Sequence, residues 1–296
     1  MSDGSKIEWC DATWQPVLGC TRVSAGCDNC YAIRQVHRQL TKTHQGLTKM
    51  RVVDPTRPLG PRSGPDWNGT VRLQPEKLSE PIRWQRSRRV FVCSLADLFH
   101  PKVPFTFIHR VFQVMADCER HTFLVLTKRP ERAREFFAWL DPDPAKMTPE
   151  LLRICAGRPW PLSNVCLGTS VEDQATADER IPHLLQCPAA VRWVSLEPQL
   201  EHVWLAKKME SADGTHAWMN AMYHLDWVVV GGESGPRARL FCDYWARSIL
   251  AQRVGLRTKV FVKQLGSYVA SVLGGDRKGG DMTLWPRDLR VREFPT

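Results

Sequence analysis

The sequence has no long apolar run and no secretion signal. Among its 296 residues nothing approaches the roughly 20 consecutive apolar residues that a membrane-spanning helix needs. The first ten residues, MSDGSKIEWC, lack the basic and then apolar pattern of a signal peptide. Hydrophobic residues make up 43% of the chain and charged residues 24%, which is ordinary for a soluble globular protein. These features predict a cytoplasmic protein with no membrane partner.

The chain also lacks the pattern of a small disulfide-stabilised protein, although it has ten cysteines. In a chain of this length without a secretion signal, cysteines are expected to be reduced thiols or metal ligands. Cys93, Cys118, Cys166 and Cys187 lie in apolar segments and are therefore expected in the core. Cys242 is expected to be an ordinary buried cysteine, with an extra metal ligand or a hydrogen-atom donor as the alternatives.

Three further cysteines crowd into one short segment. Cys20, Cys27 and Cys30 are separated by gaps of six and two residues. A structural zinc site is closed by four protein ligands, whereas a [4Fe–4S] cluster held by three cysteines keeps one iron open for an exogenous ligand. Zinc remains an alternative at this point, because Cys10 or His37 would supply a fourth ligand.

The cysteine segment belongs to a set of motifs that runs from Ile7 to Gly266. These motifs are IEWCDATWQPVLGC, GCDNCYA, FVCSLADLFH, LTKRP, LGTSVED, WVSLEP, VVVGGESGPRAR and FVKQLG. In them the chain resembles the radical S-adenosylmethionine (SAM) enzymes, and more closely a phage-associated family of uncharacterised proteins assigned to that superfamily. The resemblance implies that Cys20, Cys27 and Cys30 hold a [4Fe–4S] cluster whose open iron binds SAM. It also implies that reductive cleavage of SAM releases a 5′-deoxyadenosyl radical.

Apolar strands alternate with amphipathic helices along the chain. The expected strands lie at residues 15–19, 89–94, 121–127, 164–170, 191–198, 226–234 and 259–266. The expected helices lie at residues 30–40, 104–118, 129–140, 149–156, 171–187 and 242–255, with Pro182 expected to kink or restart its helix. This alternation is typical of a parallel sheet covered by helices. We expect a single domain, residues 1–296, that forms a partial or full TIM-like (β/α) barrel with about six to seven parallel strands.

Two irregular inserts, at about residues 42–88 and 200–224, interrupt this alternation. The proline and glycine density of the first insert excludes a continuous helix or a central strand. The net charge is +10, and most of it lies between Arg34 and Arg89. This segment contains thirteen Lys and Arg but four Asp and Glu, an excess of nine positive charges. Such a block often marks polyanion binding, with a solvated basic face as the alternative. Arginines interleaved with tryptophans bind phosphates and stack on bases. The predicted nucleic-acid contacts are Arg62, Trp67, Arg83, Trp84, Arg86 and Arg88.

Polar residues follow nearly every expected strand. Parallel barrels place their active sites at the carboxyl ends of the strands, so these residues are expected around one site. Ser94 and Asp97 are predicted to bind the ammonium group of SAM, because a hydroxyl and a carboxylate both accept hydrogen bonds from it. Ser170 and Glu172 are predicted to accept hydrogen bonds from the ribose hydroxyls.

The predicted catalytic residues are Lys128, Glu197 and Glu233. Glu233 lies in the sequence GGES at Gly231–Ser234. Many radical SAM enzymes carry a Gly-Gly-Glu element that contacts SAM after the second strand, whereas here it follows the sixth expected strand. Glu233 is therefore assigned either to SAM or to the substrate.

The leading functional hypothesis is a radical SAM enzyme that acts on a nucleic-acid base or sugar, in DNA modification or repair. Its expected partners are DNA or another nucleic acid and an electron donor. One alternative is a radical SAM enzyme that acts on a small molecule or a peptide. The other is a zinc-stabilised nucleic-acid-binding module without catalysis.

Overall fold

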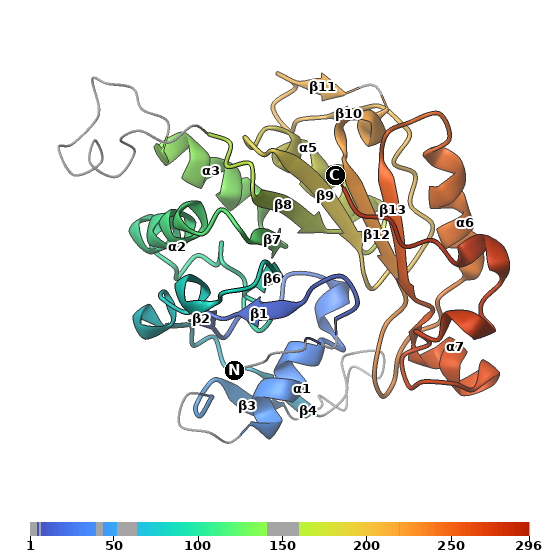
Figure 1. The fold of residues 1–296 in the computed structure, drawn as a ribbon. Helices are drawn as coiled ribbons and strands as arrows, with labels where there is room; N and C mark the ends of the chain where they lie inside the picture. The colour runs from blue at the N-terminus through green and yellow to red at the C-terminus, as the bar shows by residue number, and fades with distance from the viewer. Residues whose placement is uncertain are drawn as a thin grey trace.

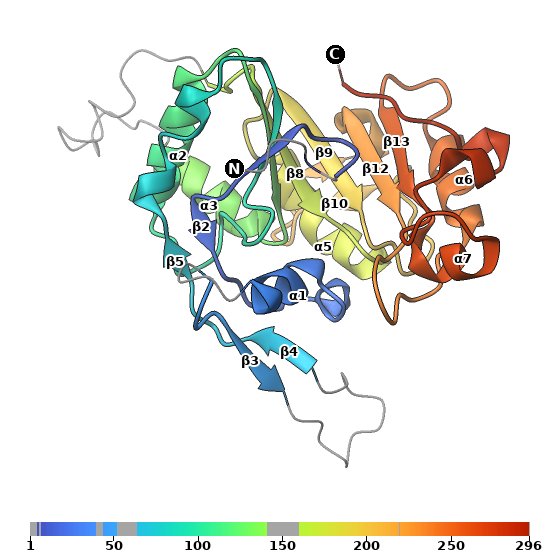
Figure 2. The same cartoon turned by 60° about the horizontal axis from the view of Figure 1, so that its bottom comes forward.

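Seven parallel strands form the central sheet of the protein, which curls into half a barrel (Figures 1 and 2). The computed structural model describes residues 5, 7–39, 44–51, 64–140, 160–218 and 220–295. In sheet order the strands are β1 (Ala12–Trp14), β6 (Arg89–Val92), β7 (Thr122–Thr127), β8 (Val165–Ser170), β9 (Val191–Leu196), β12 (Trp227–Gly231) and β13 (Lys259–Gln264). The predicted partial TIM-like barrel is confirmed.

Helices follow most of these strands and pack on the outer face of the sheet (Figure 1). The α-helices are α1 (Tyr31–Arg38), α2 (Phe105–Asp117), α3 (Pro130–Leu140), α5 (Gln174–Leu185), α6 (Asp243–Gln252) and α7 (Gly266–Leu273). The short 3-10 helices are η1 (Ala25–Cys27), η2 (Pro75–Lys77), η3 (Pro81–Arg83), η4 (Ala221–His224), η5 (Met282–Leu284) and η6 (Arg287–Leu289). The helix expected at residues 149–156 lies outside the described residues.

The two faces of the sheet bury different side chains, because successive residues of a strand point to opposite sides. Val90, Val125 and Val228 face the helices and belong to the main hydrophobic core. On the inner face, Trp9 packs edge-on against Trp193, with ring centroids 5.4 Å apart, in a second and largely aromatic cluster. This cluster fills the half barrel toward the amino ends of the strands, so the polar residues at the carboxyl ends are left around an open space.

The first strand begins earlier than the sequence predicted. Ala12 pairs with Val90 of β6, whereas Val17–Leu18 forms a separate short strand, β2, which pairs antiparallel with β5 (Arg72–Leu73). The prediction of one strand over residues 15–19 was wrong, because Pro16 has no N–H group to donate to a continuous ladder. The chain therefore leaves the central sheet just before the cysteine segment.

The inserts form small antiparallel pairs outside the central sheet. In the first insert β3 (Thr48–Arg51) pairs with β4 (Gly64–Trp67), and in the second β10 (Met209–Glu210) pairs with β11 (Ala217–Trp218). No described residue of either insert enters the seven-stranded sheet. No helix in the described ranges is long and apolar enough to cross a membrane.

Helix α5 continues through Pro182, contrary to the expected interruption. A proline leaves the carbonyl four residues earlier without its helical hydrogen bond. That carbonyl belongs to Asp178, which is exposed, so water can satisfy it.

The amino end of α5 provides a test of how this part of the fold is stabilised. The Asp173 carboxylate accepts a hydrogen bond from the Thr176 N–H at 2.8 Å, and the Thr176 hydroxyl accepts one from the Asp173 N–H at 3.1 Å. We predict that Asp173→Ala lowers the free energy of unfolding by about 0.5–2 kcal/mol, because this cap is lost. Urea denaturation followed by circular dichroism measures the change. Glu179→Ala, on the exposed side of the same helix, is the control, and equal effects of the two substitutions would contradict the prediction.

Candidate functional site

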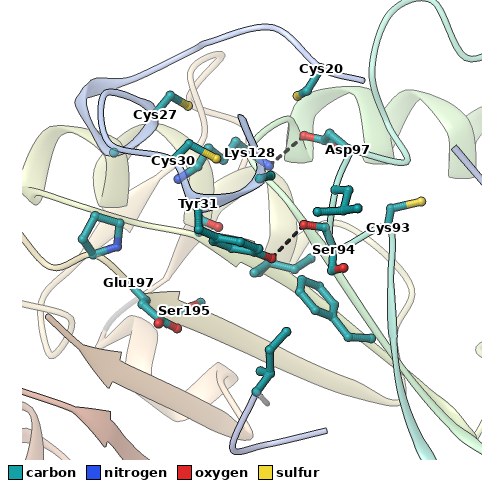
Figure 3. Close-up of a pocket in the computed structure, with 18 of the residues that line it drawn as sticks. Cys20, Cys27, Cys30, Tyr31, Cys93, Ser94, Asp97, Lys128, Ser195 and Glu197 are labelled. Carbon is teal, nitrogen blue, oxygen red and sulfur yellow. Dashed lines mark hydrogen bonds between the residues drawn. The ribbon is translucent and has the colours of Figure 1, made fainter. Parts of the chain in front are cut away.

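A cavity of about 570 Å³ lies at the carboxyl ends of the strands, beneath the segment Cys20–Cys30, here called the cysteine loop (Figure 3). Its upper side is formed by the three cysteines of this loop, and its lower side by Trp9 and Phe91 of the aromatic cluster. The strand ends contribute Ser94, Asp97, Lys128, Ser170, Ser195, Glu197, Glu233, Lys263 and Gln264 to the lining. The structure therefore brings together the three cysteines and most of the strand-end residues singled out from the sequence.

The three thiols of the cysteine loop are free and lie on the same side of the cavity (Figure 3). Burial raises the pKa of Cys20 to about 12, with a further contribution from Asp97. Burial and the neighbouring Cys27 also raise the pKa of Cys30. Burial by itself would raise the pKa of Cys27, but the Lys128 ammonium group and backbone hydrogen bonds from Val23 and Ser24 outweigh it, so this pKa is lowered. Cys27 is thus the thiol most easily converted to a thiolate.

The other candidate zinc ligands lie elsewhere. The Cys10 thiol donates a hydrogen bond to the Ser5 hydroxyl at 3.2 Å and packs in the aromatic cluster, and His37 is hydrogen-bonded to Thr48 at 3.0 Å. Neither of them lines the cavity. Cys93 does line it, but its sulfur points away from the other three (Figure 3). Within the described ranges, no three His, Cys, Asp or Glu side chains are already arranged to hold a metal ion.

Asp97 joins the ends of β6 and β7 beneath the cysteine loop. Its carboxylate is buried and accepts hydrogen bonds from the Thr127 hydroxyl at 2.7 Å, the Lys128 N–H at 3.1 Å and the Phe99 N–H at 3.0 Å. It also pairs with the Arg129 guanidinium at 2.8 Å. Both carboxylate oxygens are therefore fully used by protein donors.

Arg129 connects Asp97 to the start of the cysteine loop. Its guanidinium donates to the Thr21 carbonyl at 3.0 Å and to the Thr21 hydroxyl at 2.9 Å, and it lies 3.8 Å from the Cys20 sulfur. Arg22, the next residue of the loop, donates to Asp66 at 2.7 Å and to the Cys27 carbonyl at 2.7 Å. The first half of the loop is thereby attached both to β7 and to the first insert.

Glu172 supports the middle of the cysteine loop. Its carboxylate is fully buried and pairs with Lys128 and, at 3.0 Å, with Arg180. A Cβ atom on Gly26 would lie 2.4 Å from the Glu172 Cγ, so the loop approaches this closely only because residue 26 is glycine. Glu172 does not line the cavity, and the structure thus places it behind the loop and not beside a ligand.

Glu233 attaches the end of the cysteine loop to β12. Its carboxylate accepts hydrogen bonds from Asn29 at 2.9 Å, and from the Arg239 N–H at 2.9 Å and guanidinium at 2.6 Å. Burial alone would raise the pKa of Glu233, but these donors outweigh it and lower that pKa. Arg239 also donates to the Ala25 carbonyl at 3.0 Å, and Arg34 to the Ser234 carbonyl at 2.9 Å. The β12–α6 loop therefore closes over the cysteine loop.

Most of the predicted nucleic-acid contacts lie away from the cavity. Arg83, Arg86 and Arg88 precede β6 and are therefore at the amino end of a strand whose carboxyl end leads to Ser94 and the cavity. Arg88 lies 5.3 Å from the ring of Trp84, which also packs against the main core. Trp67 is buried beside α1 and reaches the cavity wall, and Arg62 lies outside the described residues.

Sequence reasoning missed three residues that connect the cysteine loop and α1 to the segment after β12. Asn29, Arg34 and Arg239 were not singled out, because their partners are separated from them by up to 214 residues. The available signal was the basic end of VVVGGESGPRAR, which follows the buried Glu233 and supplies its counter-charge.

Comparison with known families identifies one match. The sequence model of the family described as Protein of unknown function (DUF5131) matches residues 4–284, and the chain therefore belongs to that family. Comparisons with curated proteins and with solved structures found no match. The family description assigns no activity, so the radical SAM resemblance remains a prediction.

The attachment through Glu233 can be tested by amide hydrogen exchange. We predict that Glu233→Gln accelerates exchange at residues 24–30 by about 5- to 30-fold, because weakening a buried charged hydrogen bond by one or two kcal/mol favours local opening to that extent. Glu210→Gln, which removes an exposed ion pair with Lys208, is the matched control. Unchanged exchange in the cysteine loop of the Glu233 variant would show that this contact does not hold the loop.

The unequal pKa shifts predict unequal thiol reactivity in iron-free protein. At pH 7.5, iodoacetamide should alkylate Cys27 more than about tenfold faster than Cys20, because only the thiolate reacts and each pKa unit changes the thiolate fraction tenfold. Lys128→Met should slow alkylation of Cys27, since the ammonium group is what chiefly lowers its pKa. Peptide mass spectrometry measures both rates. Lys102→Met is the control, and faster labelling of Cys20 than of Cys27 would contradict the prediction.

Proposed function

We propose that this DUF5131 protein is a radical SAM enzyme in which Cys20, Cys27 and Cys30 hold a [4Fe–4S] cluster. The observation that carries the proposal is the convergence of three free thiols from one loop on a cavity, lined in part by polar side chains, at the carboxyl ends of a parallel half barrel. The bound cluster and SAM would supply the 5′-deoxyadenosyl radical.

The thiols fit such a cluster in number and in chemical type. Soft thiolate ligands select iron–sulfur clusters, and three cysteines leave one iron open. The three thiols would carry negative charge as thiolates. The Lys128 ammonium group lies near them and lowers the pKa of Cys27. The zinc alternative requires a fourth protein ligand, whereas Cys10 and His37 lie outside the cavity lining.

The buried carboxylates divide into two groups with different roles. Asp97 and Glu233 pair with arginines that also contact the cysteine loop, and Glu172 packs against Gly26 of that loop, so we assign the three carboxylates to positioning the loop and not to contact with SAM. Ser94 and Ser170 line the cavity and remain the candidates for contact with SAM, as predicted from the sequence. The Ser94 hydroxyl also accepts a hydrogen bond from Gln15 at 2.5 Å, which leaves its second lone pair available to an ammonium group.

The dimensions of the cavity restrict the substrate. A volume of about 570 Å³ lies within the range of roughly 300–1,000 Å³ that is typical of small-molecule sites. A nucleic-acid substrate would therefore have to present a base or sugar extruded from its helix. The position of Arg83, Arg86 and Arg88 at the opposite end of β6 favours the second candidate, a radical SAM enzyme that acts on a free small molecule. Either reaction also needs an electron donor.

Metal analysis of anaerobically purified protein tests the proposal. We predict about four irons per chain, as in a [4Fe–4S] protein, and a low-temperature electron paramagnetic resonance signal that changes when SAM is added to the reduced protein. Cys20→Ala, Cys27→Ala and Cys30→Ala should each abolish iron binding, because a ligand is lost.

Cys242→Ala is the control for these variants, since Cys242 is half-buried outside the cavity lining and should leave the iron content unchanged. Circular dichroism verifies that each variant is folded. One tightly held zinc and no response to SAM would overturn the proposal.

A further inference from the structure

An ion pair crosses the inner face of the sheet on the side of the cavity away from Cys20. Glu197 follows β9 and pairs with Lys263 of β13, although β12 lies between these strands. The residue of β12 beneath this pair is Gly231, where an added Cβ atom would lie 3.5 Å from the Glu197 Cγ. With no side chain at Gly231, the carboxylate and the ammonium group can meet above β12.

The pair is largely buried and forms part of the cavity wall. The side chains of Glu197 and Lys263 are 17% and 11% exposed. Replacing a buried ion pair by apolar residues is often neutral or stabilising, so such a pair is weak evidence for a purely structural role. Its two charges offset each other, and the wall presents a strong acceptor beside a strong donor with no net charge.

A neighbouring side chain has an unused acceptor. The Gln264 side-chain amide donates to the Gly232 carbonyl at 2.9 Å, and this fixes its orientation. Its Oε1 atom is buried and has no hydrogen-bond partner among the described residues, while the residue as a whole lines the cavity. Because this Oε1 atom has no accessible surface, a ligand in the cavity cannot reach it, and the carboxylate of Glu197 is the acceptor that this part of the wall offers.

The lower side of the cavity offers an apolar, aromatic surface. Trp9 and Phe91 both line it, with ring centroids 4.7 Å apart, and are held in place by the rest of the aromatic cluster. Ser195 adds a hydroxyl between this surface and Glu197. A flat ring that rests on the aromatic surface would therefore meet polar groups at its edge.

We infer that Ser195, Glu197 and Lys263 form a binding subsite for a neutral, planar heterocycle whose edge carries an N–H donor beside a carbonyl acceptor, as nucleobases do. The ring N–H donates to Glu197, and Lys263 donates to the ring carbonyl. A charged group would leave one member of the ion pair without its counter-charge, so the subsite selects neutral ligands. The subsite is inferred independently of the proposed function. Only the identification of the bound ring as the substrate rests on that function.

Isothermal titration with thymidine, guanosine and cytidine tests the subsite. Adenosine is omitted because it is part of SAM. We expect thymidine or guanosine to bind, and the analogue methylated at N3 of thymidine or N1 of guanosine to bind about 10- to 100-fold more weakly, because a hydrogen bond to a charged group is lost.

Glu197→Gln and Lys263→Met should weaken binding by a similar factor. Lys207→Met, which removes an exposed ion pair with Asp178, should leave it unchanged. The methylated analogues need only the unaltered protein, so they remain decisive if a variant fails to fold. Cytidine has no ring N–H and should bind weakly. Binding of neither thymidine nor guanosine, binding of cytidine alone, or equal binding of the methylated analogues would overturn the inference.

The titration is separable from the test of the cluster. Nucleoside binding by the Cys20→Ala protein, without iron, would support the subsite even if the radical SAM proposal failed. Iron binding and a response to SAM, without nucleoside binding, would support that proposal and overturn the subsite.

Discussion

The arrangement of this protein depends on how the cysteine loop is fastened across the carboxyl end of an incomplete barrel. Asp97, Glu172 and Glu233 come from the ends of three different strands, and each is at least 95% buried. Each pairs with at least one cationic side chain. Arg129 connects Asp97 to Thr21 at the beginning of the loop, Glu172 packs against Gly26 in its middle, and Glu233 accepts a hydrogen bond from Asn29 near its end. The sheet does not close into a barrel, and the segment after β12 is connected to the cysteine loop through the contacts of Glu233 and Arg239.

This fastening explains why so many charged residues stand at the strand ends. A buried carboxylate is costly unless it is paired and hydrogen-bonded, so a set of three requires a matching set of basic residues nearby. Glu197 differs from Asp97, Glu172 and Glu233. It pairs with Lys263 on the inner face of the sheet and does not contact the cysteine loop, so the pair remains available to whatever occupies the cavity.

The central sheet could be predicted from sequence because its strands are short apolar runs separated by helices. The first strand was misplaced because Pro16 divides an apolar segment whose two halves join different sheets. Convergence of the polar residues was equally predictable, since the carboxyl ends of parallel strands share one edge. Their individual roles were not, because these depend on contacts such as Asn29 to Glu233, which span 204 residues.

The position of the basic residues before β6 affects what the net charge of +10 indicates about function. Arg83, Arg86 and Arg88 precede β6, whereas the cavity begins after that strand ends, so the strand separates them from the three thiols. A polyanion bound along these arginines would lie near the amino ends of the sheet. The charges of these three arginines therefore say little about the ligand of the cavity. The chemistry of that ligand is better inferred from the neutral pair of Glu197 and Lys263 than from the overall charge.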